Sequence, residues 1–370
     1  MRVLHCIPSV EGGGAERQLT YLAKALPAEG WEVHVALTRG GANLRRLEEA
    51  GATIHQLGPI GTHDPRLFAR LVRTFVAVAP SIVHCWLLQM ELLGGVAATT
   101  AGIPWLLAER SSAPAYPRTV KNALRVQVAR FASAIVSNST AGDQYWEDRA
   151  GASMRRYIVP NALPLDEIRA TPAATSEDAG VTSGEACVLY AGRLDAGKNA
   201  ESVIRAVSLV RSARPFRALL CGDGPLRSRI EYLIEAYGLE QRVRLVGYAA
   251  NLWSLMKRVD MVIAPSRFEG SPNVVLEAMA CACPLVVSDI PAHREILDDQ
   301  SAVFFDANDA GALADHIAAV LDDPESAARR ARTAIGRAER YALPVIAHQY
   351  AGVYQDVLSR RGRRAIRVAS

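Results

Sequence analysis

Short apolar runs alternate with amphipathic stretches along the whole chain. The apolar runs have the length of β-strands, for example residues 2–10, 81–88 and 134–139. After the first of them, the apolar positions of residues 15–26 fall on one helical face. Alternation of this kind predicts a parallel β-sheet covered by helices.

A second series of the same kind follows a change in composition. Residues 162–186 are rich in Pro, Ala, Thr, Ser and acidic residues, which predicts a linker and a surface turn. Strand-like and helical stretches then alternate again over residues 186–288. Because 370 residues exceed one ordinary core, the pattern predicts two doubly wound α/β domains of similar size.

A last helix, residues 344–358, carries its apolar positions on one stripe: Ile346, Tyr350, Val353, Tyr354, Val357 and Leu358. The pattern alone leaves open which of the two halves this stripe packs against.

Composition narrows the class of protein. The chain is 50% hydrophobic and 22% charged, which is typical of a folded globular protein, and no apolar run approaches the ~20 residues of a membrane span. Its six cysteines are scattered without zinc-site spacing, which predicts reduced thiols and a cytoplasmic protein. Aromatic residues make up only 6% and do not cluster with basic ones, which argues against nucleic-acid binding.

The net charge of +4 conceals an uneven distribution. Residues 1–165 have a balance of +5, and residues 166–359 have a balance of about −6. The tail that begins at Arg360 adds five arginines and no acidic residue. A basic first half suggests a partner surface there, and an anionic membrane is one candidate.

The first motif with chemical meaning is the glycine run 12–14, which joins the first strand to the first helix. Glycines let a backbone approach an anion at a helix N-terminus, and the polar residues 16–18 follow directly. The run lacks the G-x-G-x-x-G spacing of dinucleotide sites, and no strand end carries that fingerprint, so an NAD-dependent dehydrogenase is excluded. A plain flexible turn is the alternative.

The second motif is the loop 191–199, which follows a strand. Arg193 and Lys198 lie where open α/β sheets bind ligands, and the pair suits a diphosphate. Two solvated surface cations are the alternative, but the chain has only four lysines against 38 arginines, so a lysine here is unlikely to be incidental. A similar strand-to-helix turn, Gly222-Asp223-Gly224-Pro225, follows the next strand.

The most specific motif is the segment 265–280, PSRFEGSPNVVLEAMA. It places Glu269 in a loop before a helix and Glu277 about one turn inside that helix. The amides of 273–275 at the helix start form an anion site, and the flanking carboxylates can accept hydrogen bonds from sugar hydroxyls.

These motifs, in this order and spacing, closely resemble those of retaining family 4 glycosyltransferases with the GT-B fold. The second half matches strongly, and the first half more weakly through the glycine loop, Asn138-Ser139 and Pro160-Asn161. The resemblance implies two facing Rossmann-like doubly wound domains with the active site in the interdomain cleft. It implies an acceptor-binding domain formed by 1–163 and the returning helix in 344–370, and a donor-binding domain formed by 164–343.

Roles follow from the same resemblance. Arg193, Lys198 and Glu269 are the expected catalytic residues, the first two on the donor diphosphate and the third on the transferred sugar. No cofactor and no metal are expected, because two cations and a helix dipole replace the ion. The residues expected to bind the donor are Gly13, Gly14, Gly222, Gly224, Tyr248, Gly270, Ser271, Pro272, Asn273, Val274, Val275 and Glu277.

The acceptor side departs from the family pattern. Capsule-type relatives read roughly W-x-x-H-x-D-L-L-G where this chain places Gln89 and Glu91. His84 is a substitute candidate, although a structural histidine is the alternative, and Trp86 is expected either in the core or against a sugar. The candidate acceptor residues are Arg17, His84, Trp86, Gln89, Arg110, Ser111 and Asn138.

The resemblance implies transfer of a hexosyl unit from a nucleoside diphosphate sugar, by default UDP-linked, to a hydroxyl of a lipid-linked or cell-surface glycan. The helix over 118–132 combines basic residues with a stripe of Val120, Leu124, Val128 and Phe131. That stripe predicts either an interfacial helix on an anionic membrane, hence a peripheral protein, or an ordinary core-facing helix. A sugar-nucleotide epimerase or phosphorylase on the same fold, and a catalytically silent nucleotide-binding homologue, remain the alternative functions.

Overall fold

The computed structural model divides the chain into two compact units, and the residues that it describes are 1–58, 64–151, 153–180, 182 and 184–368. Unit 1 comprises Met1–Ala162 with Tyr341–Ser370, and unit 2 comprises Leu163–Arg340. The side-chain amide of buried Gln18 bonds both the N–H and the C=O of Ala162, at 2.7 and 3.0 Å. This pair of bonds fixes the end of the first segment within unit 1.

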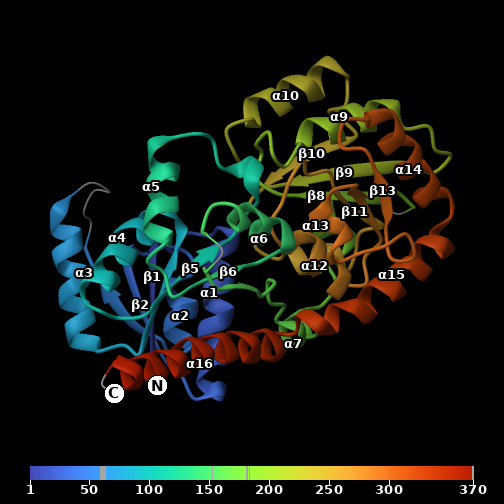
Figure 1. Ribbon diagram of the computed structural model, residues 1–370. Helices are drawn as coiled ribbons and strands as arrows, with labels where there is room; N and C mark the ends of the chain where they lie inside the picture. Colours follow the sequence, from blue (N-terminus) through green and yellow to red (C-terminus); the bar gives the residue numbers. More distant parts are fainter. Residues whose placement is uncertain (59–63, 152, 181, 183, 369–370) are drawn as a thin grey trace. The chain divides into compact units, whose positions relative to one another are not determined.

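Unit 1 is built on a seven-stranded parallel sheet with the order β3-β2-β1-β4-β5-β6-β7 (Figure 1). In the central pair, His5 lies beside His84 and Cys6 beside Cys85. The strands are β1 (Arg2–Ser9), β2 (Glu32–Arg39), β3 (Thr53–Gln56), β4 (Ile82–Trp86), β5 (Trp105–Glu109), β6 (Ala134–Ser137) and β7 (Arg156–Ile158).

Helices cover both faces of this sheet. They are α1 (Gly14–Ala25), η1 (Leu26–Glu29), α2 (Leu44–Glu49), α3 (Pro65–Val78), α4 (Leu87–Thr100), η2 (Ala113–Ala115), α5 (Val120–Ala129), α6 (Thr140–Glu147) and α16 (Leu343–Val368). Because both faces are covered, the inner strands are buried throughout, as is typical of parallel sheets.

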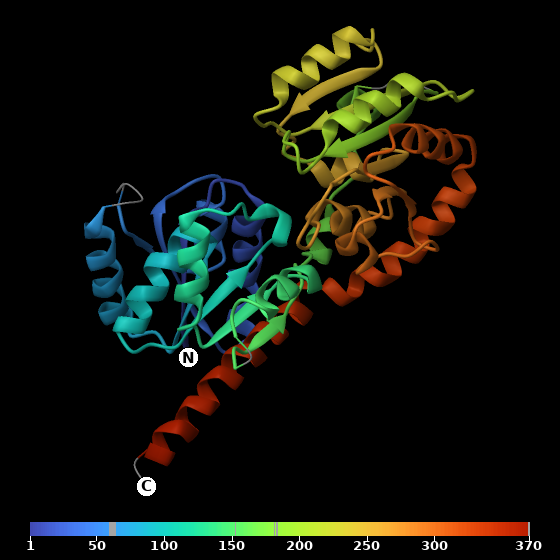
Figure 2. The same cartoon turned by 45° about the horizontal axis from the view of Figure 1, so that its top comes forward.

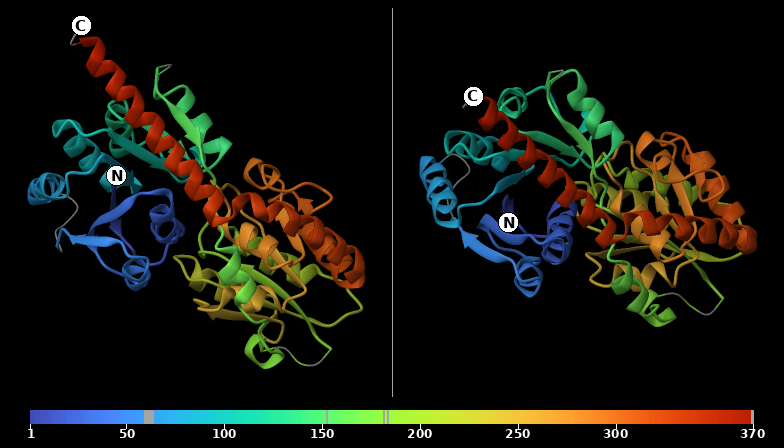
Figure 3. Two further views of the ribbon diagram at one scale, coloured as in Figure 1. Left: turned by 90° about the horizontal axis from the view of Figure 1, so that it is seen from below. Right: turned by 60° about the horizontal axis from the view of Figure 1, so that its bottom comes forward.

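The long helix α16 packs along α1 and η1 and completes the core on one face of the unit 1 sheet (Figures 2 and 3). Its apolar stripe, including Ile346, Tyr350 and Tyr354, is buried there with Leu22 and Trp31. The sequence pattern left the destination of this stripe open, and the structure places it in unit 1.

Unit 2 has a six-stranded parallel sheet with the order β10-β9-β8-β11-β12-β13 (Figure 1). Its strands are β8 (Ala186–Ala191), β9 (Phe216–Cys221), β10 (Val243–Gly247), β11 (Met261–Ala264), β12 (Leu285–Ser288) and β13 (Val303–Phe305). The short helix η3 (Glu339–Tyr341) spans the point where the chain returns from unit 2 to unit 1. The helices of unit 2 are α7 (Leu165–Ala170), α8 (Ser176–Ala179), α9 (Ala200–Leu209), α10 (Arg227–Ala236), α11 (Leu252–Met256), α12 (Asn273–Ala280), α13 (Pro291–Arg294), α14 (Ala310–Asp322) and α15 (Pro324–Ala338).

The interpretation of 162–186 as linker and surface turn is wrong for its first part. Leu165 and Ile168 are buried on α7, because two apolar residues one turn apart are enough to hold a short helix against the unit.

All six cysteines lie in the described part of the chain, buried and free of disulfides. Within the described residues, no helix combines the length and the apolar character needed to cross a membrane.

Candidate active site

The loops at the carboxyl ends of the unit 2 strands are fastened to one another by backbone hydrogen bonds. The N–H of Leu194 donates to the C=O of Asp223 at 2.9 Å, and the N–H of Arg267 donates to the C=O of Gly197 at 2.8 Å. The loops after β8, β9 and β11 therefore form one rigid rim, in the place where open α/β sheets bind ligands.

Two glycines make this close packing possible. Gly222 has φ +138°, and a Cβ there would meet the carbonyl oxygen of Gly192. A Cβ on Gly224 would lie 2.5–2.8 Å from the backbone of Leu194. Both glycines are thus required by the packing of loop against loop, independently of any ligand.

Lys198 and Glu269 meet at this rim. The Nζ of Lys198 donates to Oε1 of Glu269, and the hydroxyl of Ser266 donates to the same oxygen at 2.7 Å. The two side chains are 33% and 13% exposed, so the pair is sheltered but accessible. Two distant loops, after β8 and after β11, supply the two charges.

The loop that carries Lys198 is itself held in place. The carboxylate of Asp195 accepts a hydrogen bond from the N–H of Lys198 at 2.9 Å. Asn199 follows in the left-handed conformation, φ 55°, and its side-chain amide donates to the C=O of Pro265 at 3.1 Å and of Ala307 at 2.9 Å. Backbone strain held by such bonds is common at functional sites.

Opposing effects determine the pKa of Glu269. Burial raises its pKa, but the charge and hydrogen bond of Lys198 and the hydroxyl of Ser266 outweigh it, so the pKa lies below the ordinary value. Glu269 is therefore a carboxylate at neutral pH. Nearby, His293 is fully buried, and burial lowers its pKa; its Nδ1 lies 2.8 Å from the C=O of Ser288.

Helix α12 begins beside Glu269. Pro272 occupies its N-cap position and makes no side-chain capping hydrogen bond. The amides of Asn273, Val274 and Val275 precede the first intrahelical bond, from Leu276 to Pro272, so they form a site of positive potential. Glu277 lies on the same helix and is buried, while Gly270, Ser271 and Pro272 form the turn that leads into it.

Two other expected donor residues are open to solvent. Arg193 is 70% exposed, with its Nε 3.7 Å from a carboxylate oxygen of Asp195. Tyr248, which follows β10, is 79% exposed. Both are placed to respond to a ligand rather than to support the core.

In unit 1, the glycine loop leads into α1 as the sequence predicts. Gly13 is the N-cap residue and Gly14 the first residue of the helix, both exposed, and Arg17 is half-buried one turn later. Gln18, the last of the polar residues 16–18, is buried, and its amide bonds the backbone of Ala162.

His84 and Trp86 are core residues, which corrects their candidacy as acceptor contacts. Both are fully buried, with Nδ1 of His84 2.8 Å from the hydroxyl of Tyr354 and the indole N–H of Trp86 3.0 Å from His5. Burial, with the neighbouring His5 and Arg110, lowers the pKa of His84 well below its usual value. The rings of Tyr350 and Tyr354 on α16 pack against the His84 ring, with centres 5.8 Å away in both cases.

The other candidates of unit 1 lie near the carboxyl edge of its sheet. Arg110 is half-buried, donating to Asn161 and, at 3.2 Å, to the hydroxyl of Tyr350. Asn138 is buried beneath it, Nδ2 donating to the C=O of Arg110 at 3.3 Å, while Ser111 is half-buried. Gln89, in the first turn of α4, is half-buried and follows Leu87, whose φ of 64° strains the strand-to-helix turn.

A buried charge cluster of unit 1 was not predicted. Arg125 is 2% exposed and pairs with Glu91 and, at 3.0 Å, with Glu109. Its guanidinium lies 4.6 and 4.8 Å from the ring centres of Tyr116 and Trp146. Burial raises the pKa of Glu91 to about 7, although Arg125 acts in the opposite direction.

Among the described residues, no group of three or more His, Cys, Asp or Glu gathers as a metal site.

Comparison with known proteins agrees with this geometry. The family model "Glycosyltransferase Family 4" matches residues 12–167, and the model "Glycosyl transferases group 1" matches residues 174–337. The crystal structure of Anabaena Alr3699/HepE in complex with UDP-glucose superposes with a TM-score of 0.85, covering 96% of this chain and 100% of that one at 22% identity. The fold is therefore GT-B.

Two curated relatives are sugar transferases. The α-D-kanosaminyltransferase of Streptomyces kanamyceticus is 29% identical over 276 residues, which cover 69% of this chain and 71% of the relative. The lipopolysaccharide core biosynthesis glycosyltransferase LpsD of Rhizobium meliloti is 27% identical over 371 residues, which cover 98% and 100%. The two family models together span most of the chain, which is therefore a family 4-like glycosyltransferase with the GT-B fold, an enzyme that transfers sugar from a nucleotide-sugar donor.

Proposed function

We propose that the enzyme moves a hexosyl unit from a UDP-sugar to a hydroxyl of a lipid-linked or cell-surface glycan, with retention of the anomeric configuration and without a metal ion. The observation that carries this proposal is the Lys198–Glu269 pair beside the N-terminus of α12. It places a cation, a carboxylate and the positive end of a helix dipole together on one rigid rim, which suits a diphosphate joined to a sugar.

In this proposal the diphosphate is bound by Arg193, Lys198 and the amides of 273–275. Glu269 accepts hydrogen bonds from hydroxyls of the transferred sugar, which a carboxylate at neutral pH does well. Glu277 accepts from the ribose hydroxyls, Gly222 and Gly224 line the nucleoside pocket, and Tyr248 meets the base.

Retention follows from a substitution on one face of the sugar. The bond from the anomeric carbon to the diphosphate oxygen breaks, and the acceptor oxygen forms its bond on the same face. The departing phosphate oxygen takes the acceptor proton, while Arg193 and Lys198 stabilise the developing negative charge. These two cations and the dipole of α12 fill the role that a divalent ion has in other transferases.

The choice of donor and acceptor rests on the relatives. Alr3699/HepE is known in complex with UDP-glucose, which supports a UDP-linked donor, and LpsD acts in lipopolysaccharide core biosynthesis, which supports a glycan acceptor. On unit 1, Arg17, Gln89, Arg110, Ser111 and Asn138 stay the proposed acceptor contacts. Peripheral attachment to the inner face of the cell membrane would bring the enzyme to a lipid-linked acceptor.

A two-stage experiment tests the proposal. The first stage is a thermal shift screen with UDP, GDP, ADP and their sugars. UDP and its sugars should raise the melting temperature of the enzyme, because a ligand that binds only the folded state stabilises it. NMR of the product should then show an unchanged anomeric configuration, and activity should survive a chelator. Conversion of the sugar nucleotide without an acceptor would instead favour an epimerase, and an inverted product would exclude the same-face mechanism.

A further inference from the structure

Helix α5 buries the charged side chain of Arg125 and leaves several apolar side chains, on the helix and just beyond its end, exposed. Arg125 and Ala129 are buried, whereas Val120, Leu124 and Phe131 are 77%, 51% and 68% exposed. Of the four residues predicted to form one stripe, Val128 packs against the core, while the other three are exposed, so the core-facing alternative is wrong for those three. We call these three exposed residues the α5 stripe.

The buried charge cluster explains why α5 cannot rotate about its axis to bury its exposed apolar residues. Arg125 balances Glu91 and Glu109 inside unit 1. Rotating the helix to bury the stripe would leave two carboxylates without their cation, at a greater cost than exposing three apolar side chains. The exposure of the stripe is thus imposed by the core.

The surroundings of the stripe are uniformly basic or neutral. Arg118, Lys121 and Arg130 are exposed beside it, and no acidic residue occurs between Ser111 and Gly142. An exposed apolar row with flanking cations on a helix is the arrangement that binds the surface of an anionic bilayer.

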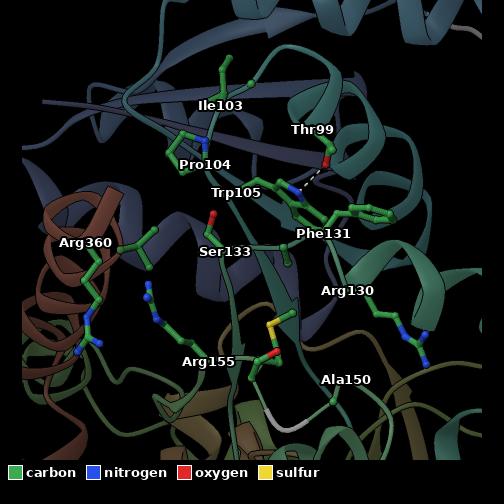
Figure 4. Close-up of a pocket in the computed structure, with 16 residues that line it drawn as sticks. Thr99, Ile103, Pro104, Trp105, Arg130, Phe131, Ser133, Ala150, Arg155 and Arg360 are labelled. Carbon is green, nitrogen blue, oxygen red and sulfur yellow. Dashed lines mark hydrogen bonds between the residues drawn. The ribbon is translucent and has the colours of Figure 1, made fainter. Parts of the chain in front are cut away.

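A pocket of about 810 Å³ continues this face (Figure 4). It lies at the amino ends of β5, β6 and β7, and is lined there by Pro104, Ser133 and Arg155 among others. It is therefore at the opposite edge of the sheet from the candidate acceptor residues. Phe131 of the α5 stripe also lines it, so the stripe and the pocket are continuous.

Three arginines border the pocket. Arg155 and Arg360 lie on one side and Arg130 on the other, and none of the sixteen described lining residues is acidic (Figure 4). Arg360 is paired with Asp356 at 2.7 Å. Within the described part of the chain, Arg130 and Arg155 form no ion pair, which leaves both guanidinium groups available to a phosphate.

We propose that the α5 stripe and this arginine pocket together dock unit 1 on an anionic phospholipid surface. Leu124 and Phe131 enter the interface, and a lipid phosphate occupies the pocket between Arg130 and Arg155. A second copy of the chain fits this face less well, because a two-fold contact would set the same cations against one another. The docking face is independent of the donor chemistry and does not rest on the proposed transfer.

Co-sedimentation of the full chain with vesicles tests the proposal. We expect binding to phosphatidylcholine vesicles that contain phosphatidylglycerol and little binding to phosphatidylcholine alone. The double variant Arg130→Gln/Arg155→Gln should lower the partition coefficient on the order of tenfold or more. The matched control Arg46→Gln/Arg73→Gln removes the same charge from exposed sites on α2 and α3 and should bind like the wild type.

The variant Leu124→Ser/Phe131→Ser separates insertion from charge. The binding defect of this variant relative to the wild type should persist at high salt, because salt screens the contribution of the arginines but not that of the apolar side chains. Release of nucleotide from a soluble donor should be unchanged in every variant, so failure of the docking face and failure of the proposed transfer are distinguishable.

Four outcomes would overturn the proposal. The first is that the wild-type chain does not bind anionic vesicles, and the second is that the pocket variant binds them as well as the control does. The third is saturable binding of inorganic phosphate or glycerol phosphate without vesicle binding. The fourth is that the wild type self-associates in place of binding vesicles, and that the stripe variant abolishes the self-association. The third outcome would assign the pocket to a soluble anion, and the fourth would assign the face to a second copy.

Discussion

The two units carry charged residues at comparable edges of comparable sheets, yet they use them differently. In unit 2, Lys198, Glu269 and Arg193 lie on loops and keep part of their surface accessible. In unit 1, Glu109 at the end of β5 and its partner Arg125 are almost completely buried. One set of charges is available to a ligand, and the other set is satisfied within the domain.

The difference teaches that a charged residue at the carboxyl edge of a strand is not in itself a sign of catalysis. A buried ion pair holds elements in register, and breaking it costs folding free energy. A sheltered but accessible pair can exchange its partner for a substrate. Changes in the Arg125 cluster of unit 1 should therefore lower stability and spare turnover, whereas changes at the Lys198–Glu269 pair of unit 2 should lower turnover with a smaller effect on stability.

Arg125→Met should give the largest effect. It leaves Glu91 and Glu109 buried without their cation, so the free energy of unfolding should fall by about 3–5 kcal/mol. Chemical denaturation would measure it, with Arg73→Met on the exposed face of α3 as control. Adding Glu91→Gln should restore part of the loss; an unchanged midpoint for Arg125→Met would remove the distinction between the units.

Lys198→Ala should lower kcat roughly 10²–10³-fold, because it removes a donor that stabilises the charge of the departing phosphate. The melting temperature should fall less than in Arg125→Met, since the Lys198 side chain is partly exposed and its loop is held by Asp195 and Asn199. Lys24→Ala, on exposed α1 of unit 1, is the matched control. Activity within a few-fold of the wild type would refute the role of Lys198.

Glu269→Gln should lower kcat/KM by a factor on the order of ten to a hundred, the value of a hydrogen bond to a charged group. Its pKa in the folded state lies below the ordinary 4.5, so the carboxylate contributes stability above about that pH and loses it as the pH falls through the lower folded value. A pH series of unfolding should show this acid loss in the wild type and less of it in the variant. Equal acid sensitivity of both would contradict the pairing with Lys198.

Tyr354→Phe should give the smallest effect. It deprives buried Nδ1 of His84 of its partner, at a cost of about 1–2 kcal/mol in unfolding free energy, while kcat stays unchanged. Tyr237→Phe, at a half-exposed hydroxyl of unit 2, is the control. A specific loss of kcat in Tyr354→Phe would return His84 to the list of acceptor contacts.

The sequence predicted unit 2 better than unit 1 for a physical reason. The residues 193–199 and 265–277 are contiguous motifs, and part of what holds each loop lies within it, as the bond from the N–H of Lys198 to Asp195 does. In unit 1, His84 finds its partner 270 residues away in Tyr354. The apolar periodicity of 118–132 predicted one stripe of four residues, but the structure buries Val128 in part and exposes Val120, Leu124 and Phe131. The orientation of α5 depends on Arg125, whose carboxylate partners come from α4 and β5.

Hydrogen exchange of the full chain with and without UDP tests the central claim most directly, because it reports where the nucleotide binds without relying on turnover. The account predicts slower exchange in the loops 192–199 and 222–226 and over 270–276 at the start of α12, with α5 and the arginine pocket unchanged. Protection confined to unit 1, in an enzyme that turns over a UDP-sugar, would contradict it.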